Sequence, residues 1–275
     1  MTISVLLRVL SLTAVASLCS AFASAQSKGS SGVVEISDKG FPGYVVDDVV
    51  VPVPSEIFAV LDKLGEPNWK QELHGIESPQ TTDRTRLSLL FGTVVAEGFV
   101  AVQAQDKKAV EDIGREVIDL STTLGLKNAV LPHANAILDA SKKSDWPTIR
   151  KEFDLTQKTV RDTMDKMKDN DLAQCVSVGG WLRGTAAVTS VVGKNFSTDR
   201  AELLMQPLLV NHFIGQISKM SDSIKSHSTV TAISEGLGSI KLAMEKSSDG
   251  FTADTVESIG KTCHRLLGLI DGKTK

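Results

Sequence analysis

Residues 87–104, LSLLFGTVVAEGFVAVQA, and residues 175–192, CVSVGGWLRGTAAVTSVV, decide the fold of this chain. Each stretch is apolar on every side at helical spacing and carries one formal charge, Glu97 in the first and Arg183 in the second. A helix that is apolar all round is buried, because its apolar faces would otherwise contact water. The charges keep both stretches from being the roughly 18 to 20 uncharged residues that span a bilayer. We predict two central helices of a bundle and no transmembrane anchor in the mature chain.

Helix start and stop signals continue on both sides of these two stretches and predict an all-α domain over residues 55–271. Ser, Thr, Asp or Pro begins most of the apolar-periodic segments, and Gly or Ser-Asp-Gly often separates them. About nine or ten helices joined by short loops define a multi-helix bundle. One alternative is a domain of two related halves, in which Trp69 and Trp146 correspond. The ten expected helices cover residues 55–65, 83–105, 106–124, 131–142, 145–168, 171–192, 197–205, 207–226, 229–246 and 252–270, and residues 67–73 are a candidate for one further short helix.

The N-terminal residues have the pattern of a secretory leader. Arg8 precedes the apolar residues 9–18, and Ala23-Ser24-Ala25 resembles a cleavage site, so residues 1–25 are a predicted signal peptide. Leu18 before Cys19 argues against the lipoprotein alternative, which needs a small residue at that place. We expect residues 26–54 to form a polar, flexible lead-in followed by an extended arm or short hairpin rich in β-branched residues. We expect a protein of the periplasm or the extracellular space.

Charge and cysteine content restrict the partners and the redox chemistry. The formal net charge is −3 at pH 7, and loss of Arg8 with the leader makes it more negative, so nucleic acid is not an expected partner. Cys175 and Cys263 remain after cleavage, either as a disulfide between two late helices or as two buried thiols. Cys263-His264 is not a haem-attachment site, because the earlier cysteine of that motif would fall at Gly260. No cofactor is expected.

Glycines and lone charges in the two central stretches each allow two interpretations. A glycine inside a helix costs roughly 1 kcal/mol relative to alanine, which either close helix contact or a ligand against bare backbone must offset. Glu97 and Arg183 must be paired if they are buried, and pairing with each other is one form of this. Alternatively, Arg183 offers its guanidinium to a carboxylate or phosphate in a pocket lined by Trp181.

Signatures of catalysis and metal binding are missing from the sequence. His212 lies in an apolar segment and is more often a satisfied core residue than a ligand, and the other histidines are scattered without ligand spacing. No Gly-x-Ser-x-Gly motif is present. We therefore expect no metal site, and a non-enzymatic exported protein that binds or scaffolds another envelope protein.

The alternative function is a small-ligand carrier or an enzyme with an anion-binding pocket between the glycine-rich helices. Its predicted ligand-binding residues are the polar-capable side chains embedded in apolar helices. These are Arg183, Trp181, Glu97 and His212.

Overall fold

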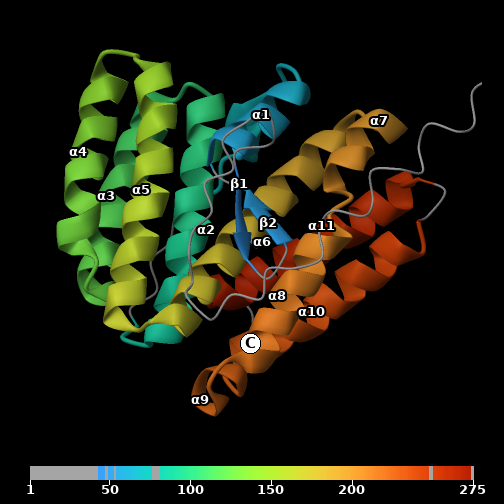
Figure 1. Cartoon of the computed structure of the whole chain (residues 1–275). Coiled ribbons are helices and arrows are strands. Elements are labelled where there is room, and N and C mark those ends of the chain that lie inside the picture. Colours follow the sequence, from blue (N-terminus) through green and yellow to red (C-terminus); the bar gives the residue numbers. More distant parts are fainter. Residues whose placement is uncertain (1–42, 47–48, 53, 76–80, 248–249, 274–275) are drawn as a thin grey trace, which may run out of the picture. The chain divides into compact units, whose positions relative to one another are not determined.

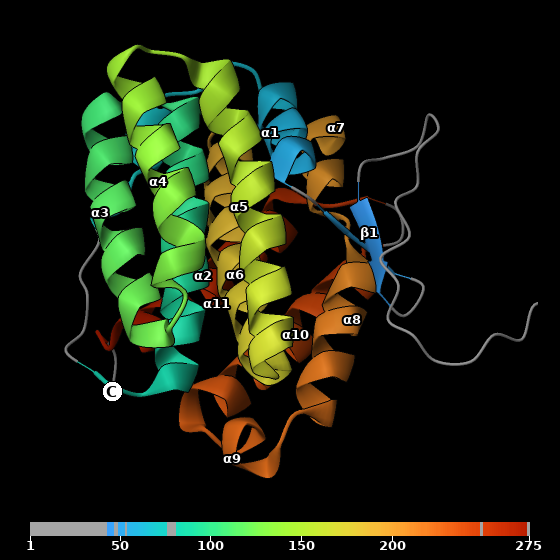
Figure 2. The ribbon, with the colours of Figure 1, turned by 60° about the vertical axis from the view of Figure 1, so that its left-hand side comes forward.

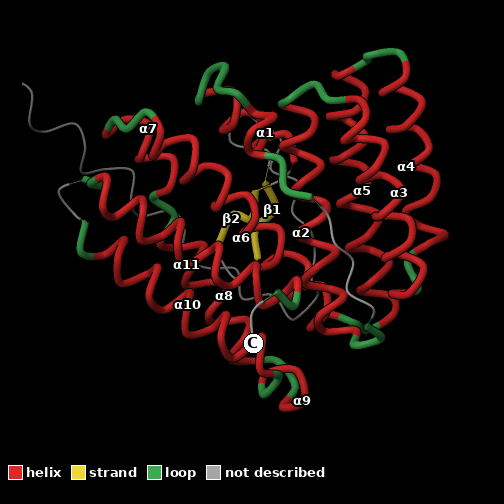
Figure 3. Tube along the Cα trace, turned by 180° about the vertical axis from the view of Figure 1, so that it is seen from behind, coloured by secondary structure: helices red, strands yellow, loops and turns green. Residues whose placement is uncertain are grey.

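The two glycine-bearing stretches form the long helices α2 (Arg84–Gln103) and α6 (Asn170–Lys194), which share the most extensive contact in the fold. The computed structural model describes residues 43–46, 49–52, 54–75, 81–247 and 250–273. Helices dominate these residues (Figures 1 and 3), so the prediction of an all-α multi-helix bundle is confirmed.

The other helices flank the α2–α6 pair on two sides, as Figures 1 and 2 show. On one side α3 packs against α2, α4 against α3, and α5 against α4; on the other, α11 packs against α6, α10 against α11, and α8 against α10. A continuous core of buried apolar side chains joins these layers. The long flanking helices are α3 (Lys107–Leu124), α4 (Lys127–Lys142), α5 (Trp146–Met167), α8 (Pro207–Lys219), α10 (Ser228–Glu245) and α11 (Ala253–Asp271).

Shorter elements complete the described chain. Strands β1 (Gly43–Val46) and β2 (Val49–Pro52) pair antiparallel, with Val46 opposite Val49, and β2 lies against α8. Helix α1 packs on α5, and the 3₁₀ helix η1 packs on both α2 and α6. The remainder of the predicted arm and the whole predicted leader lie outside the described residues. The short helices are α1 (Pro54–Lys63), η1 (Trp69–Glu72), α7 (Thr198–Ala201), η2 (Glu202–Leu204) and α9 (Asp222–Lys225).

Local side-chain caps explain where several helices begin. The Asp83 carboxylate accepts hydrogen bonds from the backbone N–H groups of Thr85 and Arg86, which fixes the start of α2. Such caps satisfy backbone donors that have no partner within the helix. The residues that cap α3, α5, α7 and α11 in the same way are Asp106, Asp145, Ser197 and Thr252.

Three predicted boundaries are wrong. Ser55 does not cap α1, because the helix begins at Pro54 and the Ser55 N–H donates to Asp154 Oδ1 at 2.8 Å. Helix α4 begins at Lys127 and continues through Pro132, which lies within its second turn. The expected helix over 207–226 is two helices, because the chain turns to an extended conformation at Met220.

Glycines allow α2 and α6 to approach each other at backbone distance. A Cβ atom on Gly92 would lie 1.9 Å from the carbonyl oxygen of Val176, and one on Gly179 would lie 2.0 Å from that of Leu89. No larger residue fits at either position without displacing the neighbouring backbone. Close helix contact, the first of the two interpretations, is confirmed at these two glycines.

Helix α2 is also the one described helix that is long and apolar enough to cross a membrane. Most of its apolar window, 83%, is buried inside the protein. Burial of this extent is what a core helix shows.

Candidate functional site

Arg183 and Glu97 form an ion pair between α6 and α2. Arg183 Nε donates to Glu97 Oε2 at 2.6 Å, and the two side chains are 3% and 4% exposed. Each charge therefore offsets part of the free energy that the other loses when it leaves water. A charge in an apolar interior needs such a partner. Mutual pairing, one of the forms proposed from the sequence, is what the structure contains.

The end of η1 covers this ion pair. Arg183 Nη2 donates to the backbone carbonyl of Glu72 at 2.5 Å, and the His74 N–H donates to Glu97 Oε1 at 2.5 Å. The buried carboxylate of Glu72 pairs in turn with Lys194, near the end of α6. We call Glu72, Glu97, Arg183 and Lys194 the buried charge cluster, in which the first three side chains are buried and Lys194 reaches Glu72 from the exposed side. Its two carboxylates balance its two cations.

One donor of this cluster is left over. Arg183 Nη1 is buried and has no hydrogen-bond partner among the described residues. A buried donor of this kind costs free energy unless a water molecule or another acceptor satisfies it.

Two histidines lie beside the buried charge cluster, at its exposed edge. The rings of His74, which follows η1, and His264, on α11, have centroids 5.7 Å apart, and both residues are exposed. The pKa of His264 is lowered by partial burial of the ring and by the nearby charges of His74 and Arg183, with Glu72 acting in the opposite direction. The neutral imidazole is therefore favoured at pH 7.

Trp181 faces away from this cluster. Residues two apart on a helix point about 200° apart around its axis, so Trp181 and Arg183 leave α6 on opposite sides. Trp181 Nε1 donates to Gln206 Oε1 at 3.0 Å, and its ring centroid lies 5.8 Å from that of Phe213 on α8. The buried ring of His212 lies 6.0 Å from the same phenylalanine.

The four predicted site residues thus form two pairs. Arg183 contacts Glu97 on one side of α6, and Trp181 and His212 lie around Phe213 on the other. A ligand role for any of these residues stays a prediction.

The cysteines are free thiols in the core. Cys175 on α6 and Cys263 on α11 are both buried and unbonded, so the disulfide alternative is wrong and the alternative of two buried thiols is confirmed. Each packs as a small apolar side chain, and burial raises the pKa of both thiols to about 12. Thiols held in the neutral form are poor nucleophiles.

A chain of polar groups joins α4 to α5. His133 Nδ1 lies 2.9 Å from Glu152 Oε2, and its Nε2 lies 3.0 Å from Thr159 Oγ1. An ionised carboxylate only accepts, so Nδ1 donates to Glu152 and Nε2 accepts from the Thr159 hydroxyl. A carboxylate, an imidazole and a hydroxyl in this order are also found where a hydroxyl is activated as a nucleophile. Thr159 lies within a helix, however, where the backbone N–H groups already bond to carbonyls four residues earlier and cannot stabilise an oxyanion.

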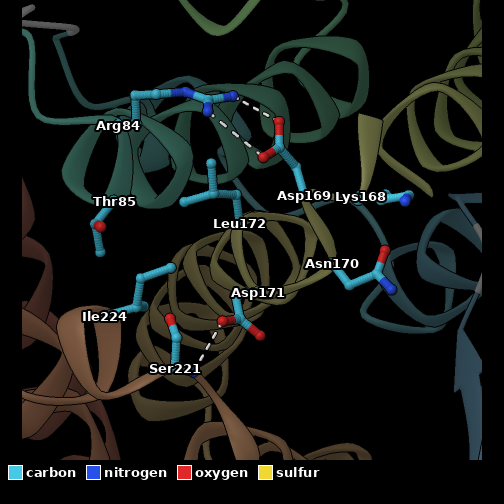
Figure 4. A pocket seen from close by; sticks show the side chains of 9 residues that line it. All are labelled: Arg84, Thr85, Lys168, Asp169, Asn170, Asp171, Leu172, Ser221 and Ile224. Carbon is cyan, nitrogen blue, oxygen red and sulfur yellow. Dashed lines mark hydrogen bonds and ion pairs between the residues drawn. The ribbon is translucent and has the colours of Figure 1, made fainter. Parts of the chain in front are cut away.

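An open pocket of about 420 Å³ lies where α2 and α6 begin, near α9 (Figure 4). Three of its four charged lining side chains are engaged: Arg84 Nη2 donates to Asp169 Oδ2 at 2.6 Å, and Asp171 Oδ2 accepts from the Ser221 N–H at 2.9 Å. The fourth, Lys168, is exposed. These pairs tie helix ends together, which is a structural role.

Sequence reasoning missed four residues at the buried charge cluster: Glu72, His74, Lys194 and His264. Their contacts join residues as far apart in sequence as Glu72 and Lys194, and residue spacing along the chain does not predict a contact over such a distance. His74 and His264 were considered only as scattered histidines without ligand spacing, and His264 also for haem attachment.

Neither the geometry nor known proteins assign a chemistry to the chain. Within the described ranges, no group of three or more His, Cys, Asp or Glu side chains is placed to hold a metal ion. No protein family, curated protein or solved structure matches this sequence.

Proposed function

We propose that this protein is an exported, non-enzymatic binding module that docks another protein of the cell envelope. The leader-like pattern of residues 1–25 supports export. The observation that carries the binding function is an exposed apolar surface where α6 and α8 meet.

Three residues form this surface, which we call the Trp181 surface: Trp181, Met205 and Leu208. Leu208 is 72% exposed on the first turn of α8, and Met205, three residues earlier, is 38% exposed. Half-buried Trp181 reaches the same region, because its indole bonds to Gln206, which lies between them in sequence. Tryptophan and methionine are enriched at protein interfaces, and tryptophan is a frequent hot spot.

A ligand pocket between the glycine-rich helices is the weaker proposal. Gly92 and Gly179 bring the two backbones into contact, which leaves a ligand no space at those positions. Two nitrogens of Arg183 are already engaged, by Glu97 and by the Glu72 carbonyl. An anion at Arg183 would have to displace these contacts or use the remaining Nη1.

The test compares the native protein with a variant of the Trp181 surface. Native mass spectrometry of the exported protein should show an otherwise empty chain in a stoichiometric complex with one protein, which purified components should reconstitute. Leu208→Ser combined with Met205→Ser should weaken that complex by at least about tenfold, or about 1.4 kcal/mol.

Leu242→Ser is the matched control, since Leu242 is 50% exposed on α10. It removes a similar exposed leucine from another helix and should leave the complex unchanged. A co-purifying small anion instead of a protein would favour the carrier. Equal weakening by both variants would remove the Trp181 surface from the proposal.

A further inference from the structure

The exposed histidine pair, His74 and His264, has a geometry that the binding function does not use. The two residues come from distant parts of the sequence and meet because η1 and α11 both pack on α2 and α6. Their ring planes are inclined by 34°, and their centroids are 5.7 Å apart.

The ring nitrogens of His74 and His264 make fewer hydrogen bonds than those of His133 and His227. His133 uses both ring nitrogens, toward Glu152 and Thr159. His227 also uses both, with Nε2 2.6 Å from Asp83 Oδ2 and Nδ1 accepting from the Thr229 N–H. These two rings are held as structural links.

His74 is held at one nitrogen only. Its Nδ1 lies 3.0 Å from the backbone carbonyl oxygen of Glu72. A carbonyl only accepts, so Nδ1 carries the hydrogen and the neutral ring keeps its lone pair on Nε2. Histidine ligands of metal ions are commonly oriented by a hydrogen bond of this kind from their other nitrogen.

His264 supplies the second imidazole. Over the described part of the chain, its ring nitrogens make no hydrogen bond. The lowered pKa described above favours its neutral form, which is the form that binds a metal.

We propose that His74 and His264 form a two-histidine site for a divalent transition-metal ion of tetrahedral preference such as Zn²⁺, for which Cu²⁺ serves as a spectroscopic probe. Metal–nitrogen bonds of about 2.0 to 2.1 Å at a near-tetrahedral angle place two imidazole centroids roughly 5 to 6 Å apart. The observed separation of 5.7 Å lies in this range. Imidazole is a preferred ligand of these ions.

The buried charge cluster prepares one side of the site. Glu97 accepts the His74 N–H, and the Glu72 carbonyl accepts its Nδ1–H, so both backbone and ring of this ligand are fixed. Water would complete the coordination, since the described residues place two ligand side chains together here and no third. A bound ion would join η1 to α11 across the exposed edge of the cluster.

The experiment uses the full chain without a histidine tag and Cu²⁺ as the probe. Electron paramagnetic resonance should show one Cu²⁺ with nitrogen couplings from two imidazoles, and calorimetry should give the affinity. His74→Ala and His264→Ala should each lose one nitrogen coupling and weaken binding by at least about tenfold. Zn²⁺ should compete for the site and raise the Tm of the wild type but of neither variant.

His133→Ala is the control, because the ring nitrogens of His133 are already occupied. It should bind Cu²⁺ with the wild-type affinity and spectrum. Circular dichroism will show that each variant is folded, and both ligand positions are exposed, so their substitution leaves the core intact. Wild-type spectra from His74→Ala or His264→Ala, or equal weakening by His133→Ala, would overturn the proposal.

Discussion

The two helices of the central pair α2–α6 contact each other differently from the two helices of the flanking pair α4–α5. Helices α2 and α6 run parallel, because Arg84–Asp169 joins their starts and Glu97–Arg183 joins them further along. Both are buried nearly all round, whereas α4 and α5, which a short loop joins, expose one face to water. In the central pair, backbone meets backbone at glycines and the charges are paired inside. In the flanking pair, side chains meet side chains and polar links such as His133–Glu152 lie near the surface. A helix that is buried on all sides therefore accepts fewer substitutions than a helix with one face in water.

The largest effect is expected from filling the glycine contact. Gly179→Leu places a side chain where a Cβ would already lie 2.0 Å from the Leu89 carbonyl oxygen. Overpacking against backbone should cost more than about 3 kcal/mol and prevent folding in a marginal protein. Urea unfolding followed by circular dichroism measures this loss.

Gly184→Ala is the matched control on the same helix. A Cβ there meets nothing within 4 Å, so the better helix propensity of alanine should leave stability unchanged or raise it by up to about 1 kcal/mol. Equal destabilisation by both substitutions would show that the backbone contact is not what makes Gly179 necessary.

The next effect separates a buried arginine from an exposed one. Arg183→Met leaves Glu97 buried without its partner and should cost about 3 to 5 kcal/mol. Arg150→Met breaks the Asp62 pair on the flanking side, where the two side chains are 34% and 51% exposed, together with the hydrogen bond to Gln103 and the contact with the Phe58 ring. It should cost about 1 to 2 kcal/mol. Chemical denaturation measures the loss of unfolding free energy in both variants. Equal losses in Arg183→Met and Arg150→Met would contradict the comparison.

The polar link between α4 and α5 should have a moderate effect. His133→Ala removes two side-chain hydrogen bonds at a partly exposed position and should lower the free energy of unfolding by about 1 to 2 kcal/mol. Thermal unfolding measures this change. A loss as large as that of Arg183→Met would mean that the flanking pair is no more tolerant than the central one.

The smallest effect concerns acid stability on the flanking side. The hydrogen bond from Arg150 is the main cause of the lowered pKa of Asp62, whose ordinary value is 3.8. A lowered folded pKa stabilises the protein fully above the unfolded value, and this contribution disappears as the pH falls through the folded pKa. The difference in unfolding free energy between wild type and Asp62→Asn should therefore be constant above about pH 5 and shrink below 3.8. A difference that persists unchanged at pH 2 would contradict this assignment.

The sequence was most informative about the central pair. Nearly uncharged composition predicted that residues 87–104 and 175–192 are buried, and helix propensity predicted that their glycines need an offsetting contact. Helical spacing also predicts that Trp181 and Arg183 point in opposite directions, and the prediction of one site containing both residues did not take this into account.

The surroundings of the ion pair could not be predicted in the same way. The Glu72 carbonyl that meets Arg183 is a backbone group from a residue 111 positions earlier, and every residue carries such a carbonyl. The split of the segment 207–226 at Met220 depends on one backbone conformation, which no breaker residue such as proline or glycine marks at that position.

A double-mutant cycle on Arg183 and Glu97 tests the central claim, that the charges of the glycine-bearing helices serve each other. Arg183→Met and Glu97→Leu should each destabilise the protein strongly, because each leaves one buried charge alone. The double variant should be more stable than the sum of the two losses predicts, with a coupling energy of about 2 to 3 kcal/mol. Losses that add to within about 0.5 kcal/mol would contradict the claim and return Arg183 to the role of a ligand-binding residue.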